Sequence, residues 1–357
     1  MTQLPSEAGA QSQAGWLGTR LAAEMSALTL EKVRVIGPQN AERNRFRILA
    51  GKSVLALRST PLIEGDTALV IAAGPSLHRR DVARLLKEMS FAGVVITTES
   101  ALSYCVRHEI VPDLVVTLDS HADRIVRWFG DPNLTRERLD RDNYFSRQDM
   151  DPGFAGDELR FNQELLHLVD TYGPKIRIAV ASSASEAVVD RVYAAGMEVY
   201  WWNPFYDDYE RPDSLTRRLY ELNGLPCLNA GGNVGSACWV IAHAVLRKKR
   251  IGLLGVDFSY YPDTPYERTQ YYQELMHLVG RDRLDEVFIR VYNPHLGQEF
   301  YTDPAYLWYR DSFLEMVQEA PCETFNCTEG GILFGTGLTF TTLRSFLERE
   351  ARRPETG

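Results

Sequence analysis

The sequence predicts an α/β fold: a Rossmann-like, doubly wound, mostly parallel sheet with a helical N-terminal appendage. From Thr67 onward, short apolar runs of strand length alternate with segments of helical periodicity. This pattern is typical of buried parallel strands joined by crossover helices. Glycine, serine, asparagine and acidic residues directly follow several of these runs, at the edge where open parallel sheets bind their ligands. The 357 residues, 45% of them apolar, suffice for one large domain with appendages.

Composition divides the chain into four parts. Residues 1–14 are small and polar, and we expect a disordered tail there. Residues 15–66 alternate amphipathic helical stretches with a short apolar run, which predicts the N-terminal helical appendage. Residues 67–335 form the predicted Rossmann-like nucleotide-binding transferase domain, and residues 336–357 a C-terminal helix and tail.

The strands and helices of the central domain follow from these periods. Six apolar runs are predicted strands, at residues 68–72, 94–97, 114–118, 176–180, 198–201 and 251–254. Helices are predicted at residues 78–89, 100–108, 185–195 and 234–246. We interpret the polar, irregular segment 129–172 as an insertion or lid. Later elements are predicted helices near 269–279, 304–319 and 340–350 and a short strand at 324–326.

Charge and composition exclude several classes of function. The net charge of −9 argues against nucleic acid as a partner. The chain has neither a membrane-span-length apolar stretch nor a secretory signal pattern at its start, so we expect a cytoplasmic protein without a membrane span. The five cysteines form no CxxC pair, which favours reduced core thiols over disulfides or a metal site.

The turn Gly74-Pro75-Ser76, which follows the first predicted strand, is a candidate phosphate site. Glycine allows close backbone approach, proline presets φ, and the free N–H groups of a helix N-terminus bind anions. The alternative is an ordinary tight turn in which Ser76 caps the next helix. Glu99 and Ser100, after the second strand, are further candidates for contact with the nucleotide.

The run 229–236 is a second anion-site candidate, with Gly231, Gly232, Asn233 and Ser236 as its binding residues. Its glycines and asparagines permit the positive φ angles that gather backbone amides into a nest. No Gly-Lys-Ser/Thr follows, and the spacing of a dinucleotide fingerprint is missing. A P-loop and a nicotinamide site are therefore disfavoured.

Asp119, His121 and Asp257 are the candidate catalytic residues. Each aspartate follows an apolar strand, where it can meet a ligand hydroxyl, a Mg²⁺ ion or an acceptor proton, or else cap a helix. His121 lies two residues from Asp119 and could supply a base near neutral pH. The aromatic segments 201–206 and 258–262 either wall a base or sugar pocket or close the core.

Several of these motifs, taken in order, carry a family resemblance over about residues 67–335. They are Gly-Pro-Ser-Leu after the first strand, Glu-Ser-Ala-Leu after the second, and the segments 110–119, 231–236, 254–260 and 326–331. This order resembles the motility-associated-factor (Maf) flagellin glycosyltransferases. That family shares its domain with the 6-hydroxymethylpterin diphosphokinase MptE-like proteins.

The resemblance implies a domain similar to the bacterial sialyltransferase (GT-A variant) fold. It implies transfer of a nonulosonic, sialic-like acid from a CMP-activated donor to flagellin or another surface-glycan acceptor. The diphosphokinase branch instead implies transfer of pyrophosphate from ATP to a pterin alcohol, with Asp119 and Asp257 sharing Mg²⁺. The segment 326–331 favours the sugar-transferase branch, and a non-catalytic nucleotide-binding module is a third alternative. The oligomeric state is left open.

Overall fold

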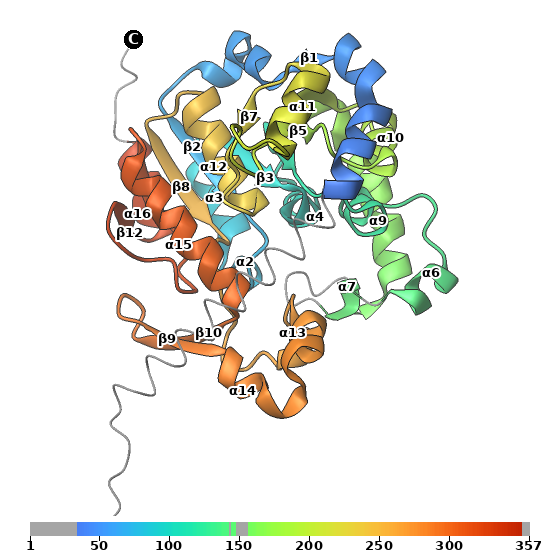
Figure 1. Ribbon diagram of the computed structural model, residues 1–357. Helices are drawn as coiled ribbons and strands as arrows, with labels where there is room; N and C mark the ends of the chain where they lie inside the picture. The colour runs from blue at the N-terminus through green and yellow to red at the C-terminus, as the bar shows by residue number, and fades with distance from the viewer. Residues whose placement is uncertain (1–33, 143, 148–155, 352–357) are drawn as a thin grey trace, which may run out of the picture.

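The protein is described here by a computed structural model that covers residues 34–142, 144–147 and 156–351 (Figure 1). The expected disordered tail at residues 1–14 lies outside the described residues. A ten-stranded sheet runs through the described chain, and every pairing within it is parallel. The predicted Rossmann-like α/β class is confirmed.

The order of the sheet is β1-β6-β5-β4-β3-β2-β8-β11-β12, with β7 paired to β6. The strands are β1 Lys52–Ser53, β2 Thr67–Ile71, β3 Val94–Thr98, β4 Leu114–Thr117, β5 Arg177–Ala181, β6 Glu198–Pro204, β7 Cys227–Leu228, β8 Arg250–Leu254, β11 Glu323–Asn326 and β12 Leu338–Phe340. All six strands predicted in the central domain are present. The added ones, β1, β7 and β12, are two or three residues long, too short to show a hydrophobic period.

The side chains of alternate residues along a strand pack into two different apolar layers. Ala68 and Val70 of β2 face one layer, whereas Leu69 and Ile71 face the other. The first layer is covered by α12 (Val234–Val240, continued by a π-helical turn over Ile241–Val245) and α15 (Pro304–Glu319). The second is covered by α3 (Val82–Met89), α4 (Glu99–Arg107), α9 (Glu158–Tyr172), α10 (Glu186–Ala194) and α16 (Leu343–Ala351).

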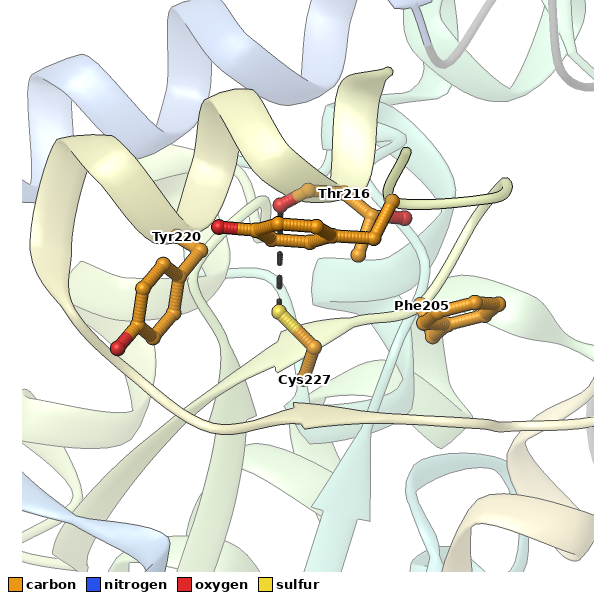
Figure 2. Close-up of a pocket in the computed structure, with 5 residues that line it drawn as sticks. Phe205, Thr216, Tyr220 and Cys227 are labelled. Atoms are coloured by element: carbon orange, nitrogen blue, oxygen red, sulfur yellow. Dashed lines mark hydrogen bonds between the residues drawn. The ribbon is translucent and has the colours of Figure 1, made fainter. Parts of the chain in front are cut away.

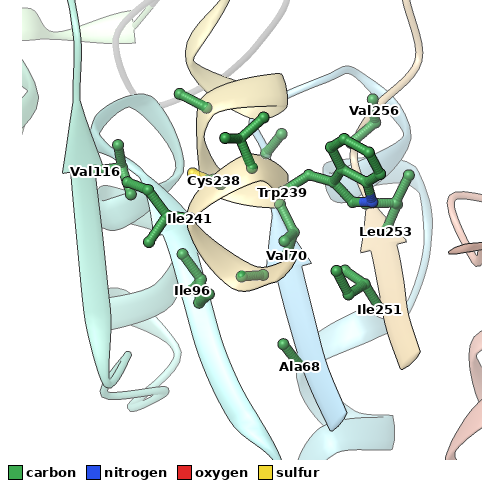
Figure 3. Packing of buried hydrophobic residues seen from close by; sticks show 14 of the residues in the cluster. Ala68, Val70, Ile96, Val116, Cys238, Trp239, Ile241, Ile251, Leu253 and Val256 are labelled. Atoms are coloured by element: carbon green, nitrogen blue, oxygen red, sulfur yellow. The ribbon is translucent and has the colours of Figure 1, made fainter. Parts of the chain in front are cut away.

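Figure 3 shows how α12 lies across the middle of the sheet. Cys238 and Ile241 sit above Val70, Ile96 and Val116, all fully or almost fully buried. Trp239 reaches sideways to Leu253 on β8, and its indole N–H donates to Thr324 Oγ1 at 3.0 Å. This residue therefore joins α12 to β8 and β11.

The structure corrects parts of the predicted domain plan. The predicted helix 78–89 is two helices, α2 (Ser76–Arg79) and α3, because Arg80 between them has an extended backbone. Within the segment expected to be an insertion or lid, α9 is instead the crossover helix between β4 and β5, with Phe161, Leu165 and Val169 buried in the core. Among the described residues of that segment, the short helices α6 (Arg136–Arg141) and α7 (Tyr144–Arg147) lie farther from the sheet (Figure 1), although Phe145 of α7 is buried and Tyr144 lines the cavity described below.

The described portions of both predicted flanking parts, residues 34–66 and 336–351, are built into the central domain, whereas residues 15–33 and 352–357 lie outside the described residues. The helix over residues 34–50 inserts Asn40 and Asn44, each at most 3% exposed, among the loops after β4 and β5. Asn40 Nδ2 donates to the carbonyls of Ser120 and Ser183 at 3.1 and 2.9 Å, and Asn44 Nδ2 to those of Ser182 and Ala184. At the other end, β12 extends the sheet and α16 buries Leu343 and Phe346.

The remaining elements connect these layers or project from them. The short helices are α5 Ala122–Ile125, α11 Leu215–Asn223, α13 Tyr272–Val279 and α14 Leu284–Val287. The hairpin of β9 (Ile289–Asn293) and β10 (Gln298–Thr302) was not predicted. With α13 and α14 it forms a projecting segment between β8 and α15 that has its own small apolar core around Leu275, Phe288 and Tyr301 (Figure 1).

Trp239 provides a test of the core. Trp239→Ala should lower the free energy of unfolding by about 3–5 kcal/mol, because it leaves a large cavity between α12 and β8 and strands the Thr324 hydroxyl. Urea unfolding followed by circular dichroism measures this. As a control, Phe46→Ala should change stability by less than about 0.5 kcal/mol, because Phe46 is 84% exposed. Equal losses in the two variants would contradict the role assigned to Trp239.

Candidate functional site

The order of the strands places a crevice between β2 and β8. The strands β3 to β6 lie on one side of β2, and β8, β11 and β12 lie on the other. The chain therefore leaves the carboxyl ends of β2 and β8 in opposite directions. Open α/β sheets bind ligands at such a switch point.

A cavity of about 810 Å³ lies there. Its walls come from the loops after β2, β3, β4, β6, β7 and β8 and from α15. The predicted site residues that line it are Gly74, Pro75, Glu99, Ser100, Asp119, Gly231, Gly232, Asn233 and Asp257. Ser76, His121 and Ser236 are not among the residues that line it.

The turn after β2 is locked to the loop after β8. Gly74 N donates to Gly255 O at 2.8 Å. A Cβ atom on Gly74 would lie 2.1 Å from Asp257 Oδ2 and 2.4 Å from Gly255 O, so only glycine fits at this position. The interpretation of Ser76 as a helix cap is wrong: the cap position is Pro75, which makes no side-chain hydrogen bond.

Ser76 instead binds Asp257. Its hydroxyl donates to Asp257 Oδ2 at 2.7 Å and its backbone N–H to Oδ1 at 3.3 Å. Asp257 is 1% exposed, and burial raises its pKa to about 7, against the lowering effect of the Ser76 hydrogen bonds. Both of its oxygens are thus engaged within the protein, and it ties the two loops together at the edge of the cavity.

The glycine run before α12, the candidate nest, adopts the predicted positive φ angles. Gly231 and Gly232 have φ angles of +55° and +80°, and Gly231 N donates to Asn229 Oδ1 at 3.0 Å. Asn233 caps α12 by accepting from Ser236 N at 2.9 Å, and its Nδ2 donates to Ser236 Oγ. Ser236 is therefore buried behind the cap. A Cβ on Gly232 would lie 2.6 Å from the ring of Trp308, so the nest packs directly under an aromatic side chain.

Glu99 begins α4 at the carboxyl end of β3, after Thr98, whose Oγ1 accepts from Ala101 N. Glu99 is 4% exposed, and burial raises its pKa to about 8. Its Oε2 is buried without a hydrogen-bond partner in the described structure. Ser100 next to it pairs with Thr98 through their hydroxyls, 3.0 Å apart.

Asp119 is exposed at the mouth of the cavity, and its Oδ1 accepts from the backbone N–H of His121 at 2.9 Å. The imidazole of His121 is also exposed. The two predicted partners are thus linked through the backbone, while the His121 side chain stays outside the cavity lining.

Sequence reasoning missed one wall of the cavity, a face of α15. It comprises Trp308, Tyr309, Ser312, Glu315, Met316 and Glu319. Their spacing places these residues on one face of the helix, next to the buried Phe313 and Val317. A helical face of mixed polar and aromatic residues could have indicated from the sequence that α15 lines a ligand site. Of the aromatic segments that were left open, Phe205, Tyr206 and Phe258 line the cavity, whereas Trp201 and Trp202 are fully buried core.

The projecting segment completes the same wall. It contributes Gln270 and Tyr271, which bond to side chains of α15. The Tyr306 hydroxyl donates to Gln270 Oε1 at 2.6 Å, and the hydroxyls of Tyr271 and Tyr309 are 3.0 Å apart. The aromatic wall is therefore held rigidly by hydrogen bonds.

The charges at the cavity are of one sign. Within the described chain its lining includes the carboxylates of Glu99, Asp119, Asp257, Glu315 and Glu319 and contains no lysine, arginine or histidine. The described residues also contain no group of three or more His, Cys, Asp or Glu side chains placed to hold a metal ion. Binding of an anion here therefore depends on backbone N–H groups or on a cation that arrives with the ligand.

A smaller pocket of about 410 Å³ lies beside the cavity and shares Phe205 with it (Figure 2). The other side chains around it are Tyr209, Thr216, Tyr220 and Cys227. The five cysteines are unpaired in the structure; Cys105, Cys238 and Cys327 are buried, whereas Cys227 and Cys322 are partly exposed. Among the described helices, none combines the length and apolar character that crossing a bilayer requires.

Comparisons with known proteins agree with the resemblance noted from the sequence. Residues 40–129 match the family model described as 6-hydroxymethylpterin diphosphokinase MptE-like. The fold is similar to that of the MAf glycosyltransferase from Magnetospirillum magneticum AMB-1, with 14% sequence identity and a TM-score of 0.52. That alignment covers 88% of this chain but 41% of the other. A comparison with curated proteins gave no match.

Gly74→Ala tests the junction of the two loops. The added methyl group would push Asp257 off Ser76, so we expect a loss of about 2–4 kcal/mol of stability. Gly156→Ala is the matched control, because nothing lies within 4 Å of its Cβ position. Thermal unfolding of both variants checks this, and an unchanged melting temperature for Gly74→Ala would contradict the described contact.

The buried Asp257 predicts a pH dependence. Because its pKa is higher in the folded than in the unfolded chain, the folded state holds the extra proton between about pH 4 and 7, and stability falls as pH rises through this window. The free energy of unfolding of Asp257→Asn should therefore rise, relative to that of the wild type, by roughly 1–3 kcal/mol between pH 4 and pH 7. Denaturant titrations at several pH values measure the difference, and a difference that stays constant with pH would refute the buried, proton-holding carboxyl.

Proposed function

We propose that this chain is a nucleotide-dependent transferase that moves a nonulosonic acid from a CMP donor to a hydroxyl group of a protein or glycan acceptor. One observation carries the proposal: a single cavity at the switch point combines the glycine loop at the start of α12 with a wall of aromatic side chains. Such a cavity suits a ligand that has both a phosphate and stackable rings. The fold shared with a glycosyltransferase supports the same class.

The phosphate belongs at the glycine loops in this proposal. Gly231 and Gly232 form the candidate nest at the start of α12, where the N–H groups of the first turn have no acceptor within the helix. Gly74 N is already bonded to Gly255 O, so the β2 turn shapes the cavity and does not bind the phosphate through this amide. The phosphodiester and the sugar carboxylate of the donor each carry one negative charge, fewer than the roughly four of ATP, so backbone dipoles can hold the phosphodiester without a basic side chain. Burial keeps Glu99 and much of Asp257 protonated at neutral pH, which reduces their repulsion of an anion.

The aromatic wall would hold the cytosine and sugar rings. Trp308 stands over Gly232, so a ring stacked on it would lie next to the phosphate position. Acceptor hydroxyls would enter at the exposed mouth, near Asp119. The acceptor that we propose is flagellin or another surface glycan, modified in the cytoplasm.

The second candidate is a diphosphokinase that uses ATP and a pterin alcohol. The family match supports it, because residues 40–129 include the loops of Gly74, Glu99 and Asp119. ATP brings about four negative charges into an acidic cavity, so it would need Mg²⁺. With Asp257 bonded to Ser76, the cation would be held by Asp119 and by the phosphates of the substrate. The third alternative, binding without catalysis, would leave the donor intact.

Titration calorimetry with CMP, CDP, ATP and GTP, each with and without MgCl₂, tests the proposal. We expect CMP and CDP to bind without magnesium and ATP to bind more weakly, because no cation in the described lining offsets its charge. Tighter binding of ATP–Mg²⁺ than of CMP, with AMP formed in the presence of a pterin alcohol, would instead establish the diphosphokinase.

Gly232→Ala gives the matched variant for this test. It should weaken CMP binding about tenfold or more, because its Cβ would displace Trp308 from the nest. Gly224→Ala has the same kind of left-handed backbone, φ +69°, but nothing lies within 4 Å of its Cβ position and it is outside the cavity lining. An equal loss in both variants would point to general strain and against a phosphate site at Gly232.

A further inference from the structure

Glu99 is a buried carboxyl with one oxygen that the fold does not use. It opens α4 at the end of β3, lines the cavity and is 4% exposed. Its Oε2 has no hydrogen-bond partner among the described residues. Buried polar atoms are almost always paired, and an exception at a cavity wall points to a partner supplied by a ligand.

The neighbours of Glu99 do not neutralise it. Asp119, from the loop after β4, repels its charge, and burial raises its pKa to about 8. Cys238, on α12 above the sheet, is a fully buried thiol whose pKa is raised by burial and, to a smaller extent, by the Glu99 charge. The described lining of the cavity provides no cation to pair with it. Glu99 is therefore protonated at low pH and becomes a strong proton acceptor once it ionises.

The other candidate bases are less suited to a reacting proton. Asp257 binds Ser76 with both oxygens, and the His121 side chain is outside the cavity lining. Asp119 is exposed and one of its oxygens accepts from His121 N. Glu99 alone among these residues combines burial, a place in the cavity and a free oxygen.

We infer that Glu99 is the general base that takes the proton from the acceptor hydroxyl. The inference rests on the proposed transfer to a hydroxyl. As the acceptor O–H bond breaks, the proton moves to the Glu99 carboxylate and the oxygen bonds to the anomeric carbon of the donor sugar. The bond from that carbon to the phosphate oxygen breaks, its electron pair leaves with CMP, and the proton later passes from Glu99 to water. Attack of a pterin alcohol on the β-phosphate of ATP, with AMP leaving, needs the same proton acceptor.

Hydrolysis of CMP-N-acetylneuraminic acid, with water as the acceptor and CMP release as the readout, tests this role. In the wild type, kcat should rise about tenfold per pH unit below about pH 8 and level off above it, because only ionised Glu99 acts as a base. Glu99→Gln should lower kcat by about 100-fold or more and abolish this rise, while the Kd of CMP from calorimetry changes less than about threefold. Glu99→Asp, which keeps the carboxyl, should retain a rise with pH at a reduced rate.

Glu158→Gln is the matched control, since Glu158 is also a buried carboxyl with a pKa raised to about 7 by burial, but it pairs with Arg127 away from the cavity. It should keep the wild-type pH profile. Full activity of Glu99→Gln, or a wild-type rate that falls as pH rises through 8, would overturn the base assignment and leave the transfer function standing. A wild type that releases neither CMP from this donor nor AMP from ATP and a pterin alcohol would overturn both.

Discussion

The contact between Ser76 and Asp257 is the constraint on which the site depends. It joins the ends of β2 and β8, neighbouring strands whose connections run in opposite directions. The contact leaves no room for side chains around it: Gly74, Gly330 and Gly331 would each place a Cβ within 3 Å of Asp257. Three loops from three strands thus close around one buried carboxyl, and the cavity keeps its shape because this junction is rigid.

Sequence reasoning recovered the scaffold where the pattern was local. The six longer apolar runs are strands and the glycine run has positive φ angles, because buried parallel strands and left-handed backbone each have their own residue signatures. The helix α15 was located at its observed bounds. Its role as a wall of the site was missed, because the residue pattern of a helix shows which face is covered but does not identify the part of the protein or the ligand that covers it.

The failures concern the three-dimensional surroundings of residues, which a local sequence pattern does not give. Ser76 follows a turn and precedes a helix, so a cap was the local reading, but its hydroxyl meets an aspartate 181 residues away. His121 is close to Asp119 in sequence, yet their side chains do not meet across the cavity. Glu99 gave no sign of burial, because a glutamate at the first turn of a helix is ordinary on a protein surface. The helix α9 was not predicted because polar residues dominate the segment 129–172 and only a narrow face of this helix is apolar.

The two edges of the sheet have a consequence for the behaviour of the molecule at high concentration. A long parallel sheet normally ends in strands whose free N–H and C=O groups can pair with another chain. Here the outermost described strands, β1 and β7 at one edge and β12 at the other, are two or three residues long, so each edge offers only a few such groups. A sheet that narrows at both ends in this way offers little template for edge-to-edge aggregation.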